Sequence, residues 1–178
     1  MQPAIPLLLT VLLAQSVFPT PIKRAIPDRK ELVDKLNDAR RTIANEHQIA
    51  NMHKLTYDDV LEKKAEAMAK NCDSVVRGPD YIIIPATNNP DIDKLAALAS
   101  LFPLQVKVGC AEMEVECIEQ GVKLNGICLM GPYSEKTGTA DLIKKGPAGS
   151  QCPGKQSNGL CVSKFSGIGN GWLSELFE

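Results

Sequence analysis

The chain has 178 residues, a length that suits a single domain once any leader is removed. Hydrophobic residues make up 44% of it, which is enough for a core that needs no metal to hold it together. The net charge of −1 implies neither a nucleic acid nor an anionic membrane surface as partner, and 4% aromatic residues argue against platforms for stacking bases or sugars.

The first twenty residues carry no charged side chain, and residues 7–14 form an apolar run that only Thr10 interrupts. This run is too short to span a membrane and has the length of a signal-peptide core. We therefore expect a signal peptide over residues 1–16, a polar linker over 17–27 and secretion into the extracellular space. The alternative is a frayed apolar N-terminus. The rest of the chain has no other long apolar run.

Residues 27–47 have the pattern of an amphipathic helix. Asp28 and Glu31 form a capping box behind Pro27. A helical apolar stripe follows, made of Leu32, Leu36, Ala39 and Ile43. The cations Lys35, Arg40 and Arg41 fall off this stripe and are expected to be solvated.

A loop and a second helix are predicted over residues 50–73. Thr56 and Asp59 form the predicted cap. The buried face is expected to contain Leu61, Ala65, Met68 and Cys72. Cys72 would end this face and could cross-link the helix to whatever covers it.

The segment from Arg77 to Asp91 is irregular because Gly and Pro interrupt it. A short strand at residues 81–84 would stop at Pro85. Asp91 is predicted to cap a third helix that ends before Pro103 and has Leu95, Leu98 and Phe102 on one side.

Residues 104–113 and 123–132 alternate like two paired strands around a loop at Gln120–Gly121. The Gly-, Ser- and Pro-rich residues 146–162 form a compact loop that one bridge could close. Helices that stand apart from an antiparallel hairpin predict an α+β layered domain.

Six cysteines in a secreted chain indicate a disulfide framework. The spacings are six, ten and eight residues within residues 110–128 and 152–161, whereas structural zinc sites place paired ligands two to four residues apart. We therefore expect bridges and no metal or other cofactor. Spacing alone leaves fifteen pairings open.

Four segments in order resemble the CAP superfamily, the SCP-like group of cysteine-rich secretory proteins, venom antigens and plant pathogenesis-related proteins. Asn37 and Arg40 keep the spacing of the family's opening-helix motif. The other three segments are residues 50–72, 106–117 and 127–135. Residues 146–161 resemble the short hinge of worm members.

The resemblance implies a CAP-like α-β-α sandwich with a small antiparallel sheet and a disulfide-closed C-terminal loop. It places the CAP-like domain at residues 28–145 and the cysteine hinge and tail at 146–178. The family's bridges imply Cys72–Cys117 and Cys110–Cys128, which leaves Cys152 with Cys161. A different pairing is the alternative.

The chain departs from the family at the central cleft, where two histidines and two acidic residues are usual. The only histidines are His47 and His53, which precede the second helix and are expected to be exposed. Glu112, Glu114 and Glu116 would follow one another along a solvated strand face. A zinc-binding or hydrolytic cleft therefore does not transfer to this chain.

These observations predict a non-enzymatic extracellular binding or signalling module, a monomer whose partner is an unknown extracellular protein or a lipid. One alternative is a carrier of sterol or fatty acid, with Ile43, Met52 and Met68 lining an apolar groove, although such residues more often form plain core. A small hydrolase, or a protease inhibitor acting through the 146–162 loop, is a further alternative.

Overall fold

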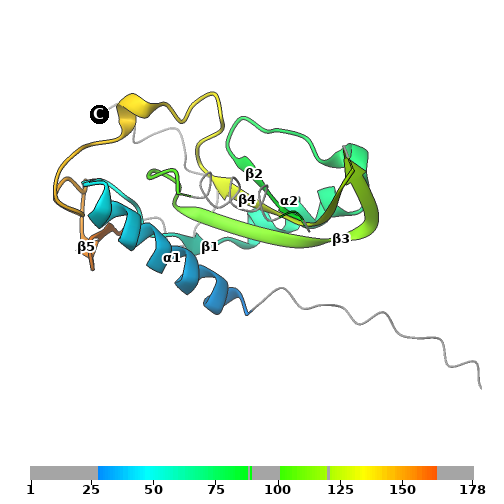
Figure 1. Cartoon of the computed structure of the whole chain (residues 1–178), viewed down its shortest axis with the longest axis horizontal. Coiled ribbons are helices and arrows are strands. Elements are labelled where there is room, and N and C mark those ends of the chain that lie inside the picture. Colours follow the sequence, from blue (N-terminus) through cyan, green and yellow to red (C-terminus); the bar gives the residue numbers. More distant parts are fainter. Residues whose placement is uncertain (1–27, 88, 90–100, 120, 164–178) are drawn as a thin grey trace, which may run out of the picture.

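The computed structural model describes residues 28–87, 89, 101–119 and 121–163. The predicted signal peptide, the linker, most of the third helix and the apolar tail lie outside these residues. The described elements, in chain order, are α1 (Arg29–Glu46), β1 (Thr56–Tyr57), α2 (Asp59–Ala69), η1 (Cys72–Ser74), β2 (Ile82–Thr87), β3 (Lys107–Glu119), β4 (Val122–Gly131), η2 (Ala140–Leu142), β5 (Gln156–Ser157) and β6 (Leu160–Cys161) (Figure 1).

A four-stranded sheet in the order β1-β3-β4-β2 forms the centre of the fold. The predicted hairpin is β3 and β4, which are antiparallel and turn at Gly121, where φ is +79°. Strand β2 pairs antiparallel with β4, and the two-residue β1 pairs parallel with β3. The sheet is therefore mixed, although most of its pairing is antiparallel.

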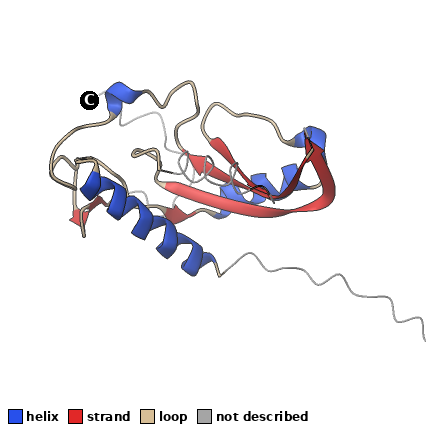
Figure 2. Cartoon of the chain, in the orientation of Figure 1, coloured by secondary structure: helices blue, strands red, loops and turns tan. Residues whose placement is uncertain are grey.

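The two faces of the sheet are covered by different helices. Strand residues that point to one face, among them Val108 and Met130, pack with Leu32, Val33 and Leu36 of α1. Their neighbours on the other face, such as Ala111 and Leu129, pack with Leu61, Ala65 and Met68 of α2. Helix, sheet and helix thus form three layers, and the predicted α+β class and α-β-α sandwich are confirmed (Figure 2).

Helix α2 begins two residues later than a Thr56 cap would place it. Asp58 is the N-cap, and its Oδ1 accepts from the backbone N–H of Val60 at 3.0 Å and of Leu61 at 2.9 Å. Thr56 instead belongs to β1, where its N–H donates to the carbonyl of Val106. The predicted Thr56–Asp59 cap is therefore wrong, because pairing with β3 holds Thr56 in extended backbone.

Three further local predictions are corrected. Pro85 lies inside β2 rather than ending it, since β2 is an edge strand and tolerates a residue without an N–H. Cys72 is exposed in η1, beyond the buried face of α2. Ala39 is exposed, although it belongs to the predicted stripe of α1.

The row of glutamates on β3 is interrupted by a bulge. Glu112 pairs with Gly126 and Cys117 pairs with Leu124, so the four residues 113–116 face the single residue 125. Residues 114–116 are all exposed, Val115 included. Glu112, Glu114 and Glu116 therefore do not continue one alternating row, although Glu114 and Glu116 are solvated as expected.

The C-terminal cysteine loop is docked on the body of the domain. Strands β5 and β6 form a hairpin whose turn is Asn158–Gly159, with φ of 50° and 77° as such tight turns require. Leu160 packs with Ala44, Ile49 and Met52 in a cluster at the C-terminal end of α1. Among the described helices, none combines the length and the hydropathy of a membrane span.

Candidate functional site

Arg40 lies at the centre of a junction between α1, the segment 53–55 and the entry to β3. Its side chain is 0% exposed. The guanidinium donates to four backbone carbonyls, those of His53 (2.8 Å), Phe102 (3.1 Å), Pro103 (2.9 Å) and Gln105 (3.0 Å). Burial lowers the pKa of Arg40 to about 9, so the group remains a cation at neutral pH.

The prediction that Arg40 is solvated is therefore wrong. Asn37, Arg40 and Ala44 recur at helical spacing and form the most buried face of α1. This face does not match the pattern of an apolar stripe, because two of its three residues are polar. The conjunction of Asn and Arg three positions apart was the signal that could have found it.

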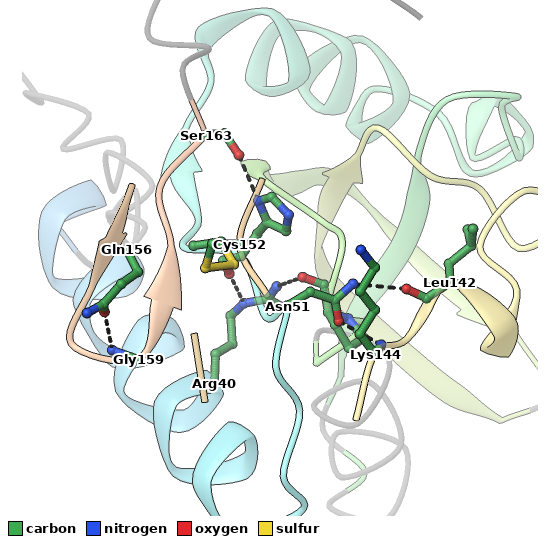
Figure 3. The surroundings of a disulfide bond; sticks show 11 residues. Arg40, Asn51, Leu142, Lys144, Cys152, Gln156, Gly159 and Ser163 are labelled. Atoms are coloured by element: carbon green, nitrogen blue, oxygen red, sulfur yellow. Dashed lines mark hydrogen bonds between the residues drawn. A yellow bond between two sulfur atoms is a disulfide. The ribbon is translucent and has the colours of Figure 1, made fainter. Parts of the chain in front are cut away.

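Buried amides hold the neighbouring loops in the same way. Asn37 donates to the carbonyl of Leu55 at 3.0 Å and accepts from its N–H at 2.7 Å. Gln105 donates to the carbonyl of Tyr133 and accepts from its N–H. Asn51 donates to the carbonyl of Leu142 and accepts from the N–H of Lys144, at 2.9 Å each (Figure 3). The polar residues of the junction therefore satisfy backbone groups.

His53 is half-buried beside Arg40, and the prediction that it is exposed is wrong. Its Nδ1 lies 2.9 Å from the Oγ of Ser163. Burial, and to a lesser degree the Arg40 charge, lowers the pKa of His53. His47 is exposed at the end of α1, as predicted. No group of three or more His, Cys, Asp or Glu side chains in the described part of the chain has the geometry of a metal site.

The three groove candidates do not gather in one place. Ile43 and Met52 lie together in the cluster at the end of α1. Met68 packs in the separate cluster between α2 and the sheet. Met52 is 0% and Met68 is 6% exposed, so both belong to core.

Sequence reasoning missed a polar cluster at the β1 edge of the sheet. The hydroxyl of Tyr57 donates to Glu62 at 2.8 Å, and the Arg29 guanidinium lies 5.0 Å from the centre of the Tyr57 ring. Arg29 also forms ion pairs with Asp59 and Glu62. Burial and the bond to Glu62 raise the pKa of Tyr57 to about 12. The cluster joins the start of α1 to α2, and Arg29 is about thirty residues from Asp59 and Glu62, too far for a local pattern to reveal.

The structure contains the bridges Cys72–Cys117, Cys110–Cys128 and Cys152–Cys161, and no described cysteine is free. The first ties η1 to β3, and the second joins residues that face each other on β3 and β4. The third closes the C-terminal loop over the junction (Figure 3).

No protein-family model and no curated protein matches the sequence. Solved structures do match. The hookworm platelet inhibitor is 20% identical, with a TM-score of 0.52 over 77% of this chain and 92% of that one. Na-ASP-1 is 16% identical, with a TM-score of 0.52 over 82% of this chain and 48% of its own, longer chain. At these identities the likeness concerns the fold alone, and the chain therefore has the same CAP-like fold as these two structures.

Proposed function

We propose that this chain is a secreted, non-enzymatic CAP-like module that binds an extracellular macromolecule. The observation that carries the proposal is that the buried polar side chains at the junction are hydrogen-bonded to backbone groups. The hydrogen-bonding groups of Asn37, Arg40 and Gln105 hold backbone segments in place. Side chains engaged in this way support the loops around them and are poorly placed to act on a substrate.

His53 and Ser163 are the described pair that most resembles a catalytic base and its nucleophile. A serine nucleophile needs an imidazole that becomes a cation as it takes the hydroxyl proton. Here the neighbouring Arg40 cation and partial burial both lower the pKa of His53, which opposes that step. The pair is better suited to hold the end of β6 in place than to catalyse hydrolysis.

The disulfides support secretion and a binding role. Bridges of this kind persist in oxidising compartments, and the apolar leader fits the same destination. They fix loops at both ends of the domain, and loops held on a rigid scaffold are the usual place for recognition. Carriage of a sterol or fatty acid is the alternative, and it would use the apolar cluster that contains Ile43 and Met52.

Expression of the full chain in a secretory eukaryotic host tests this proposal. We expect the protein in the medium, without its leader, and an organic extract of the purified protein without stoichiometric lipid by mass spectrometry. One bound sterol or fatty acid per chain would favour the carrier alternative. Retention inside the cells, with the leader intact, would contradict the proposal.

A further inference from the structure

The lysines that lack an ion pair are unevenly distributed over the described surface. Five of the twelve exposed Lys and Arg side chains in the described residues have a carboxylate within 4.0 Å, as in the pairs Lys30–Asp34 and Arg77–Glu135. Seven exposed lysines of the described residues form no such pair, and four of these are Lys54, Lys144, Lys145 and Lys155. All four belong to the C-terminal loop or to the segment on which it docks.

Backbone pairing sets two of these lysines in a row. His53 and Gln156 both lie beside Cys161, on its two sides. One residue further along, Lys54 and Lys155 therefore flank Val162, and the N–H of Val162 donates to the carbonyl of Lys155 at 2.8 Å. Residues in register point to the same face, so the two lysine Cα atoms are about 10 Å apart across the ribbon. Val162 between them is 38% exposed, which shows that this face meets solvent.

Lys144 and Lys145 extend the positive surface on the other side of the 49–54 segment. Lys145 and Ile49 form an isolated antiparallel β-bridge through their backbones. The carbonyl of Lys144 accepts from the N–H of Ala50 at 2.8 Å. Residues 142–163 contain no Asp or Glu at all. We call Lys54, Lys144, Lys145 and Lys155 the lysine face.

The exposed glutamates of β3 lie away from the lysine face. The turn between β3 and β4 lies far from β5 in Figure 1, and exposed Glu114 and Glu116 precede it. The net charge of −1 thus combines a local group of lysines with acidic residues elsewhere in the chain. A ligand that reads local charge would meet the lysine face without the repulsion that a uniformly acidic surface would cause.

We propose that the lysine face binds a sulfated polysaccharide. Separate ammonium groups in a row fit a linear chain of anionic groups, because each lysine can meet a different sulfate. A single compact anion would need donors that converge on one point, and these lysines are spread over two sides of a segment. An anionic bilayer would present a flat surface to lysines that lie on two sides of a segment, and the row offers only Val162 for apolar contact.

The loop is held in the shape that this binding needs. The Cys152–Cys161 bridge closes it, and the N–H of Gly159 donates to the side chain of Gln156 at 3.0 Å. The carbonyl of Asn158 accepts from Arg41 of α1 at 3.2 Å. A preorganised face loses little conformational entropy on binding. The inference rests on the proposed function, since sulfated polysaccharides are extracellular ligands.

The test is binding of the purified, secreted protein to a heparin oligosaccharide, used as the sulfated probe, over a series of salt concentrations. The variant is K54Q/K144Q/K155Q. The matched control is K63Q/K70Q/K136Q, which removes the same charge from three exposed lysines that also lack an ion pair among the described residues but lie away from the lysine face. All six changes affect surface side chains, so both variants should fold.

We expect wild-type binding that weakens as salt rises, at least tenfold weaker binding in K54Q/K144Q/K155Q, and less than a twofold change in the control. Equal weakening of the two variants would show that net charge alone acts and would overturn the proposal. So would binding to phosphatidylserine vesicles without binding to heparin, or no heparin binding by the wild type. A secreted protein that ignores heparin would refute this inference and leave the proposed function standing.

Discussion

The buried charge of Arg40 stabilises the fold by binding backbone carbonyls. Four carbonyls from two separate segments converge on one guanidinium, which is planar and offers donors in several directions. The carbonyls of Phe102 and Pro103 also accept from the N–H groups of Gln105 and His53, and Arg40 is the donor that the carbonyls of His53 and Gln105 receive. The residue therefore connects α1 to the start of β3 in a way that no apolar side chain could.

Arg40→Lys tests this role. The ammonium cannot reach all four carbonyls, and buried acceptors left without donors are costly, so we expect the free energy of unfolding to fall by about 3 kcal/mol. Urea denaturation measures the change. Arg41→Lys is the control, since Arg41 is half-exposed and should change stability by less than about 0.5 kcal/mol. Equal stability of the two variants would contradict the structural role of Arg40.

His53 predicts a pH dependence with a definite sign. Its pKa in the folded protein lies below the ordinary 6.5, so the folded state binds a proton more weakly than the unfolded state. The stability that His53 contributes is complete above pH 6.5 and is lost as the pH falls through 6.5 towards the lowered pKa.

We expect the urea midpoint of the wild type to decrease between about pH 7.5 and pH 5, and His53→Gln to remove much of that decrease. His47→Gln, at an exposed position, is the matched control for the loss of one imidazole. A His53→Gln profile that is identical to that of the wild type would show that this imidazole is not the group responsible.

At the scale of elements, Gly109 sets how closely α2 approaches the sheet. A Cβ at this position would lie 2.2 Å from the backbone nitrogen of Glu62 and 2.6 Å from the carbonyl carbon of Leu61. Only a glycine leaves room for the helix backbone there. This explains in physical terms why a Gly precedes Cys110 in the motif that resembles the family's strand.

Gly109→Ala should accordingly lower the free energy of unfolding by about 1–3 kcal/mol, because α2 must shift as a rigid body to relieve the contact. Gly154→Ala is a matched control, since a Cβ there meets nothing within 4 Å. Thermal unfolding followed by circular dichroism compares them. A Gly109→Ala protein as stable as the control would mean that the helix and sheet are less closely packed than described.

The bridges differ in the length of chain that they close. Cys72–Cys117 spans 45 residues and Cys152–Cys161 spans 9, which corresponds to about 4 and about 3 kcal/mol in the chain-entropy model. Each pair includes one buried cysteine, Cys117 or Cys161. We therefore expect the Cys72→Ala/Cys117→Ala variant to be less stable than Cys152→Ala/Cys161→Ala when both are measured by urea denaturation. The reverse order would show that docking of the C-terminal loop outweighs loop length.

Local patterns predicted the elements well where the determinants are local. Asp28 caps α1, and the alternation around Gly121 gives β3 and β4. The disulfides came from the resemblance to a family. What failed depends on contacts between distant segments: Thr56 pairs with β3, and Pro85 is tolerated because its strand lies at the sheet edge. The burial of His53 needs the C-terminal loop, which follows it by about a hundred residues in sequence.

At the scale of the whole molecule, the proposal of a non-enzymatic module predicts no specific zinc binding at neutral pH. His53 is held against Ser163 and half-buried, while His47 is exposed at the end of α1. Converging on one ion would require both to leave their places, with no cysteine thiolate among the described residues to assist. Isothermal titration of the secreted protein should show no one-to-one site. A micromolar site lost in His47→Ala/His53→Ala would overturn the prediction.

The described fold and the proposed secretion both require three bridges, which join η1 to β3, join β3 to β4 and close the C-terminal loop. Peptide mapping of the protein recovered from the medium, digested without reduction and analysed by mass spectrometry, tests this most directly. We predict no free thiol and the three linked pairs Cys72–Cys117, Cys110–Cys128 and Cys152–Cys161. Two or more free thiols, or a different set of linked peptides, would contradict both the extracellular assignment and the described fold.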